Sequence, residues 1–62
     1  MYCTVWFQPG PNKSRVIKAI RRVLNISLAE VKDAVEIQRV KCEKSKRREL
    51  IIEIEKAGGK EV

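Results

Sequence analysis

Histidine is absent from this chain, and other residues on which catalytic and metal sites depend are scarce. The two cysteines, Cys3 and Cys42, form no CxxC pair, so the usual zinc ligand sets are missing, as are the imidazole base and every His-dependent triad. With only three glycines, the chain holds no glycine-rich phosphate loop. We therefore expect a protein that is not an enzyme and that uses no cofactor or metal ion.

Long apolar runs are missing as well. No run approaches the roughly 20 residues of a membrane span. The opening stretch MYCTVWF lacks the basic segment and apolar core of a secretory signal. We expect a cytoplasmic protein without membrane contact, in which the two cysteines are reduced, partly buried thiols; in an oxidising compartment they could pair. Sixty-two residues with few glycines and prolines predict one small domain spanning 1–62.

Acidic residues are absent from the first 29 positions, although the whole chain contains eight. The net charge is +6, and a basic surplus attracts nucleic acid, an anionic membrane or an acidic protein. Composition alone does not choose among these partners. The basic residues of this acid-free region are Lys13, Arg15, Lys18, Arg21 and Arg22.

Residues 2–7 are aromatic or β-branched and predict a strand. Alternation directs Cys3, Val5 and Phe7 towards the core. Trp6 then lies on an open sheet face or wraps over an edge. If Tyr2 and Trp6 share an uncovered face, a weak homodimer could cover them, and otherwise we expect a monomer.

Two short helices are predicted next, and together they form the most informative stretch. Asn12 is expected to cap the first helix, and Asn25 tolerates the left-handed conformation that ends it. Ser27 and Glu30 form a capping box that starts a second helix at Leu28. Helical spacing predicts that the first helix buries Val16, Ile17, Ile20, Val23 and Leu24 opposite its cations, and that the second buries Leu28, Val31, Ala34 and Val35.

The last third of the chain predicts a strand, a helix and a terminal strand. Residues 37–43 alternate, Ser45 is expected to cap a helix, and Gly58 and Gly59 stop that helix before an edge strand at residues 60–62. We predict an α+β fold of order β-α-α-β-α-β, in which a three-stranded antiparallel sheet carries three helices on one face. The apolar stripe of the third helix comprises Leu50, Ile51, Ile54 and Ala57.

A second basic cluster violates a rule of helix electrostatics. Its cations fall at the start of the third helix, where the positive end of the helix dipole disfavours them. Either this small cost has no functional meaning, or the cluster binds an anionic partner. The secondary basic cluster comprises Lys44, Lys46, Arg47 and Arg48.

Several motifs resemble the C-terminal domain of the bacterial ribosomal stalk protein, large-subunit protein seven/twelve. The matching stretches are NK at residues 12–13, VIKAIR at 16–21, LAEVKDAVE at 28–36 and EKAGGKEV at 55–62, so the resemblance covers nearly the whole chain. It implies the same fold and a surface that recruits translational GTPases such as elongation factor G. The contact set implied by position is Lys13, Ile17, Lys18, Arg21 and Lys32, which the basic side chains Arg15 and Arg22 widen.

The chain also departs from the stalk pattern. Ser14 and Arg15 replace small apolar residues, Asn25 and Ser27 replace glycines of the inter-helix turn, and the segment before the third helix is basic instead of acidic. The dimerisation domain and hinge of the stalk protein are not in this sequence. We therefore expect a free-standing relative, of the kind that a phage or another mobile element encodes.

Three interpretations of the basic surface remain. The first is a protein-binding module that docks a translation factor or another acidic protein. The alternative is nucleic-acid binding through the same face and the secondary basic cluster, although Glu30, Asp33 and Glu36 make the second helix unsuitable for contacting phosphates. The third is that these cations are a solvated face that keeps a small domain soluble.

Overall fold

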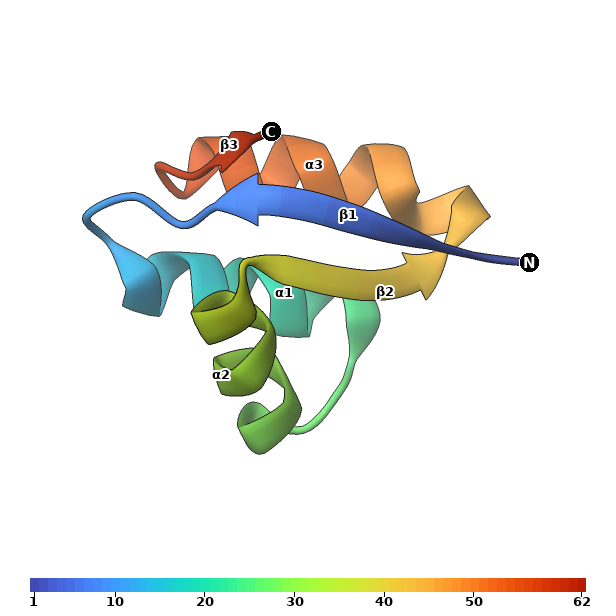
Figure 1. The fold of residues 1–62 in the computed structure, drawn as a ribbon, viewed down its shortest axis with the longest axis horizontal. Coiled ribbons are helices and arrows are strands. Elements are labelled where there is room, and N and C mark those ends of the chain that lie inside the picture. The colour runs from blue at the N-terminus through green and yellow to red at the C-terminus, as the bar shows by residue number, and fades with distance from the viewer.

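A computed structural model describes all residues, 1–62, and confirms the predicted α+β fold. In chain order the elements are β1 (Tyr2–Gln8), α1 (Lys13–Leu24), α2 (Leu28–Ile37), β2 (Arg39–Glu43), a 3-10 turn (Lys44–Lys46), α3 (Arg47–Lys56) and β3 (Lys60–Glu61). The sheet is antiparallel, with strand order β2-β1-β3. In Figure 1 the sheet lies in front of α1 and α3, and α2 extends below β2.

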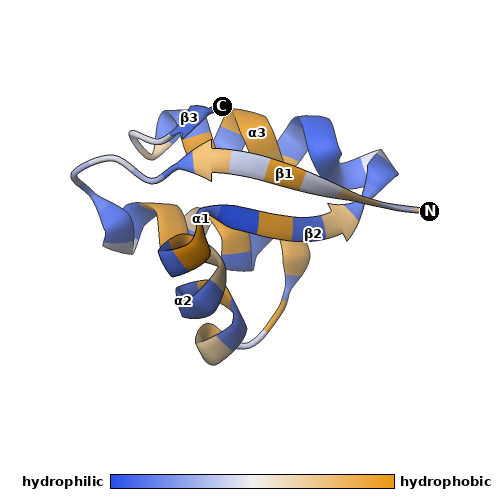
Figure 2. Ribbon diagram, viewed as in Figure 1, coloured by the Kyte–Doolittle hydropathy of each residue, from blue (hydrophilic) through white to orange (hydrophobic).

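The core lies between the sheet and the helices, where the alternation of β1 directs Val5 and Phe7. Both side chains are fully buried, and Val40 and Cys42 of β2 lie on the same side of the sheet. Figure 2 shows this alternation of hydrophilic and hydrophobic residues along β2. Trp6 remains 51% exposed on the opposite side, which agrees with the first of the two placements considered, an open sheet face. None of the helices is both long and apolar enough to cross a membrane.

Helix α1 contacts both α2 and α3, and a close approach between two loops fixes one of its ends. Gly10 has φ +72°, and a Cβ atom added there would lie 2.5 Å from the carbonyl oxygen of Gly58. Only glycine allows this approach without strain. The loop before α1 is therefore held against the loop after α3.

The helix ends agree with the predictions in part. Ser27 Oγ accepts a hydrogen bond from the Glu30 N–H at 3.3 Å, and Asn25 adopts φ 53°, so both of these roles are confirmed. Asn12 precedes α1, but its side chain makes no capping hydrogen bond. Instead its backbone carbonyl oxygen accepts from the N–H groups of Arg15 and Val16.

Three predictions about the helices and their ends were wrong. Leu28 is 43% exposed, because the first turn of α2 extends beyond the sheet (Figure 1) and no layer covers it there. Ser45 does not cap α3, because the chain first forms the 3-10 turn and α3 begins only at Arg47. Helix α2 also continues through Ile37, so that β2 starts at Arg39, two residues later than predicted.

The two cysteines lie opposite each other on β1 and β2. Their Sγ atoms are 3.8 Å apart and form a hydrogen bond but no disulfide. The pKa of the Cys42 thiol is raised from 9.0 to about 11, chiefly by burial and then by the hydrogen bond and charge interaction with Cys3, while the nearby Arg47 acts in the opposite direction. Because the folded pKa lies above the unfolded value, the resulting stabilisation is complete below pH 9 and is lost as the pH rises towards 11.

We expect Cys42 to react slowly with a thiolate-specific alkylating agent. At pH 8 its thiolate fraction should be about 100-fold smaller in the folded protein than in the unfolded chain, since each pKa unit is a factor of ten. Alkylation followed by peptide mass spectrometry at a series of pH values measures this. Steric shielding lowers the rate at every pH, whereas a raised pKa also moves the midpoint of the profile towards 11. A midpoint near 9 would contradict the prediction.

Candidate functional site

The solvent-facing half of α1 is basic because of its helical period. Its buried residues are Val16, Ala19, Ile20 and Val23, and the intervening positions carry no acidic side chain. All five cations of α1 are exposed, whereas Ile17 is half-buried at the margin of the apolar stripe. We call the predicted set the helical basic face. It comprises Lys13, Arg15, Ile17, Lys18, Arg21, Arg22 and Lys32.

One part of the helical basic face lines a groove between α1 and α2. The groove has a volume of about 320 Å³, and Ile17 and Val35 contribute its apolar surface. Lys13 from α1 and Lys32 from α2 lie beside them, together with the single carboxylate of Glu36. Three residues implied by the stalk resemblance, from two different helices, thus border one hollow.

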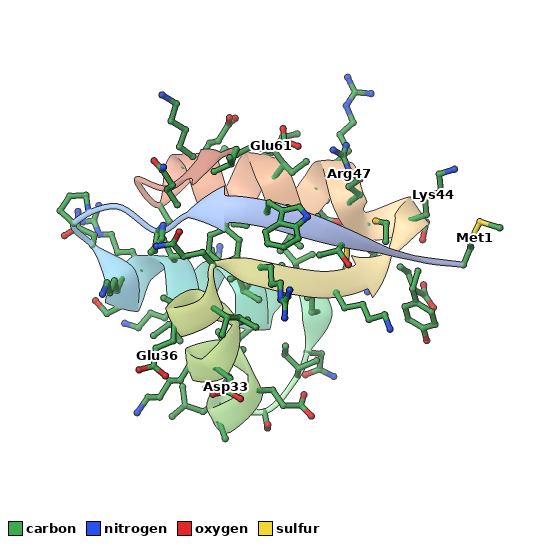
Figure 3. All side chains as sticks on the ribbon, in the orientation of Figure 1. Met1, Asp33, Glu36, Lys44, Arg47 and Glu61 are labelled. Atoms are coloured by element: carbon green, nitrogen blue, oxygen red, sulfur yellow. The ribbon has the colours of Figure 1, made fainter.

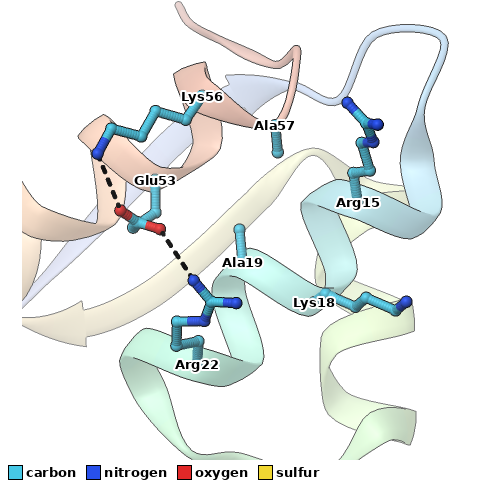
Figure 4. Close-up of a pocket in the computed structure, with 7 residues that line it drawn as sticks. All are labelled: Arg15, Lys18, Ala19, Arg22, Glu53, Lys56 and Ala57. Carbon is cyan, nitrogen blue, oxygen red and sulfur yellow. Dashed lines mark ion pairs between the residues drawn. The ribbon is translucent and has the colours of Figure 1, made fainter.

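Another part lines a separate groove of about 300 Å³ between α1 and α3 (Figure 4). Arg15, Lys18 and Arg22 come from α1, and Lys56 comes from α3. One carboxylate lies among these four cations, that of Glu53. It is 3.9 Å from Arg22 Nη1 and 3.8 Å from Lys56 Nζ, so positive charge predominates in the groove.

The cations of α1 are therefore close together in the sequence, but the two grooves divide them in space. Arg21 borders neither groove and lies on the exposed side of α1 between them. Sequence reasoning did not identify Lys56, Glu53 or Val35 as part of this surface. Of these three residues, only Lys56 has a local feature that could have drawn attention to it. It occupies the last turn of α3, where the helix dipole favours a cation.

Two of the four cations in the secondary basic cluster make contacts within the fold. Lys46 Nζ donates to the carbonyl oxygen of Val23 at 3.3 Å, close to the negative end of the α1 dipole. Arg47 forms an ion pair with Glu61 at 2.8 Å (Figure 3), which joins α3 to β3. These contacts account for two of the cations at the start of α3 without any ligand. Lys44 and Arg48 are exposed and form no ion pair within 4.0 Å.

The surface contains neither a cluster of metal-ligating side chains nor an unpaired buried polar group. No group of three or more cysteine, aspartate or glutamate side chains lies close enough together to hold a metal ion. No buried side-chain nitrogen or oxygen lacks a hydrogen-bond partner, so no polar group is directed unpaired into a cavity. Comparison of the chain with protein-family models, curated proteins and solved structures returned no match.

Proposed function

We propose that this chain is a non-catalytic, cytoplasmic protein-binding module that docks an acidic protein through its helical basic face. By resemblance to the ribosomal stalk domain, the partner is a translational GTPase of the elongation factor G type. The observation that supports the proposal best is the groove between α1 and α2, where Lys13, Ile17 and Lys32 border one hollow.

The composition of this groove suits a transient protein interface. Ile17 and Val35 provide a small apolar surface that a partner side chain can cover, and the flanking lysines remain in solvent. Apolar contacts at the centre of an interface supply affinity, while charges at the rim accelerate association and select the partner. The remaining cations of α1 extend this rim along the helix, where they would attract an acidic surface.

Nucleic-acid binding through the same helices is the alternative. The observation that favours it is the groove between α1 and α3, where four cations surround one carboxylate. Phosphate groups would fit this charge distribution. The secondary basic cluster offers fewer free cations for phosphate contacts than its composition suggests, because Lys46 and Arg47 already have partners within the fold.

The proposal is tested by comparing Ile17→Ala with Ile51→Ala. Both isoleucines are half-buried, lie on helices and pack against the core, but only Ile17 lines the groove between α1 and α2. Each substitution should lower the free energy of unfolding by about 1–2 kcal/mol, roughly half the cost in a full core. Only Ile17→Ala should weaken binding of a purified elongation factor G, by about 5- to 30-fold.

Titration of the labelled domain with the factor measures both affinities, and chemical denaturation measures both stabilities. Equal loss of binding in the two variants would mean that binding follows stability and not the groove. Absence of binding by the wild-type domain would reject the translational GTPase as the partner.

A further inference from the structure

The face of the sheet opposite the helices is uncovered and has a distinctive composition. Figure 1 shows α1 and α3 behind the sheet and α2 below β2, and the outward side chains of the three strands are exposed. We call this surface the open sheet face. It comprises Tyr2, Thr4, Trp6 and Gln8 of β1, Arg39, Lys41 and Glu43 of β2, and Lys60 of β3.

Two aromatic side chains lie on the central strand of this face. Tyr2 is 68% exposed and Trp6 is 51% exposed, although the chain contains only three aromatic residues. Because they are four positions apart on one strand, their Cα atoms are separated by about 13 Å. The threonine between them is short and separates the two rings, and Tyr2 also borders a hollow with Ile26 and Lys46 at one end of the face. The face thus offers two separate stacking positions.

Cations flank these rings from both neighbouring strands. Arg39 pairs with Trp6, Lys41 with Thr4, and Lys60 with Gln8 in the strand register. None of the three cations forms an ion pair within 4.0 Å. The Arg39 guanidinium carbon lies 5.4 Å from the centroid of the Trp6 ring, a cation–π contact that holds the indole over β2.

Charge on the open sheet face argues against self-association. Its only carboxylate is Glu43, opposite Tyr2 at one end. A two-fold dimer through this face would bring its three cations close to three identical ones, and like charges across an interface are costly. An anionic partner with flat apolar groups would satisfy both the cations and the rings.

We propose that the open sheet face binds single-stranded nucleic acid. Two bases stack on Trp6 and Tyr2, and Arg39, Lys41 and Lys60 contact the phosphates on either side. Stacking requires base faces that a duplex does not present, so the site selects single strands. The guanidinium of Arg39 itself forms a plane on which a base can stack. On one side the site is bounded by Asp33 of α2, which shares a hollow with Arg39 and Lys41.

This surface is distinct from the helical basic face. The small number of aromatic residues in the chain does not exclude a stacking surface, because their placement matters as well as their number. Here two of the three lie on one exposed strand. The inference also does not depend on the proposed docking of an acidic protein, because the two surfaces have no residue in common.

The test measures fluorescence anisotropy of a labelled oligouridine and a labelled oligothymidine of about 12 nucleotides, a length within the range of known single-strand sites. Wild-type protein should bind at least one of them at about 0.15 M salt, and affinity should fall as salt rises. Trp6→Ala should weaken binding by about tenfold or more, whereas Trp6→Phe, which keeps a stacking ring, should stay within about threefold. Circular dichroism verifies that both variants are folded.

A charge-matched pair of variants separates the two surfaces. Arg39→Gln combined with Lys41→Gln and Lys60→Gln should lower both affinity and its salt dependence, since each lost phosphate contact reduces the slope. The control is the glutamine triple variant of Lys18, Arg21 and Lys32, which removes the same charge and should bind within about twofold of the wild type.

Several results would overturn the proposal. These are no binding of either oligonucleotide, wild-type affinity in Trp6→Ala, a duplex that competes as well as a single strand, or a greater loss in the helical control than in the sheet variant. Analytical ultracentrifugation could also overturn the proposal. If the wild type sedimented as a dimer and Trp6→Ala as a monomer, the open sheet face would be an interface between two copies of the chain.

Discussion

Replacing Phe7 by alanine is expected to lower the free energy of unfolding by about 3–5 kcal/mol, the usual cost of truncating a buried aromatic residue. Phe7 is 0% exposed on the central strand of the sheet. It belongs to the hydrophobic core cluster that the sheet and the helices form together. It is the only phenylalanine in the chain. The other two aromatic side chains, Tyr2 and Trp6, are exposed and lie outside the core.

The size of the domain makes this loss severe. At roughly 0.05–0.15 kcal/mol per residue, a domain of this length has only about 3–9 kcal/mol of stability in total. The melting temperature of Phe7→Ala should fall by about 20 °C or more, and a substantial fraction of the chain should be unfolded at room temperature. Thermal and urea denaturation followed by circular dichroism measure the change.

Trp6 provides the matched control, because it is adjacent in the chain, larger and directed to the opposite side of the sheet. Trp6→Ala should cost less than about 1 kcal/mol, chiefly through loss of the contact with Arg39. If the two variants were equally destabilised, the sheet would have to be covered on both faces. That result would also remove the exposed ring on which single-strand binding depends.

Local patterns predicted most of the fold because each element has one dominant signal. Alternation in β1 directed Val5 and Phe7 inward, and the Ser27 cap located the start of α2. The errors occurred where tertiary position overrides local pattern. Leu28 has the correct helical phase for burial, but it belongs to the first turn of α2, which lies away from the sheet (Figure 1). Ser45 is a favourable capping residue, but it lies within the 3-10 turn.

The candidate site was less predictable, since it depends on how helices pack. Helical period alone showed which α1 side chains face solvent, but not that α2 and α3 divide them between two grooves. Contacts between residues far apart in the sequence could not be predicted either. The contacts of Lys46 with Val23 and of Arg47 with Glu61 span 23 and 14 residues, respectively, and no local pattern indicates them.

Reversing three charges of the helical basic face should strongly weaken the proposed docking of an acidic protein. In the variant that combines Lys18→Glu, Arg21→Glu and Lys32→Glu, each attractive contact at the rim becomes a repulsive one, and like charges across an interface cost several kcal/mol. We expect affinity for elongation factor G to fall by about 100-fold or more. All three side chains are exposed and form no ion pair, so the fold should be retained.

The control must remove the same charge from elsewhere, because net charge alone alters association. Lys44→Glu combined with Arg48→Glu and Lys60→Glu meets this requirement, since these three residues are also exposed and unpaired and lie outside the helical basic face. The control should slow association slightly and leave dissociation unchanged, whereas the helical variant should change both. Surface plasmon resonance at low and physiological salt separates the two rates. Equal losses in both variants would show that the partner responds to total charge, and the helical basic face would then be only a solvated surface.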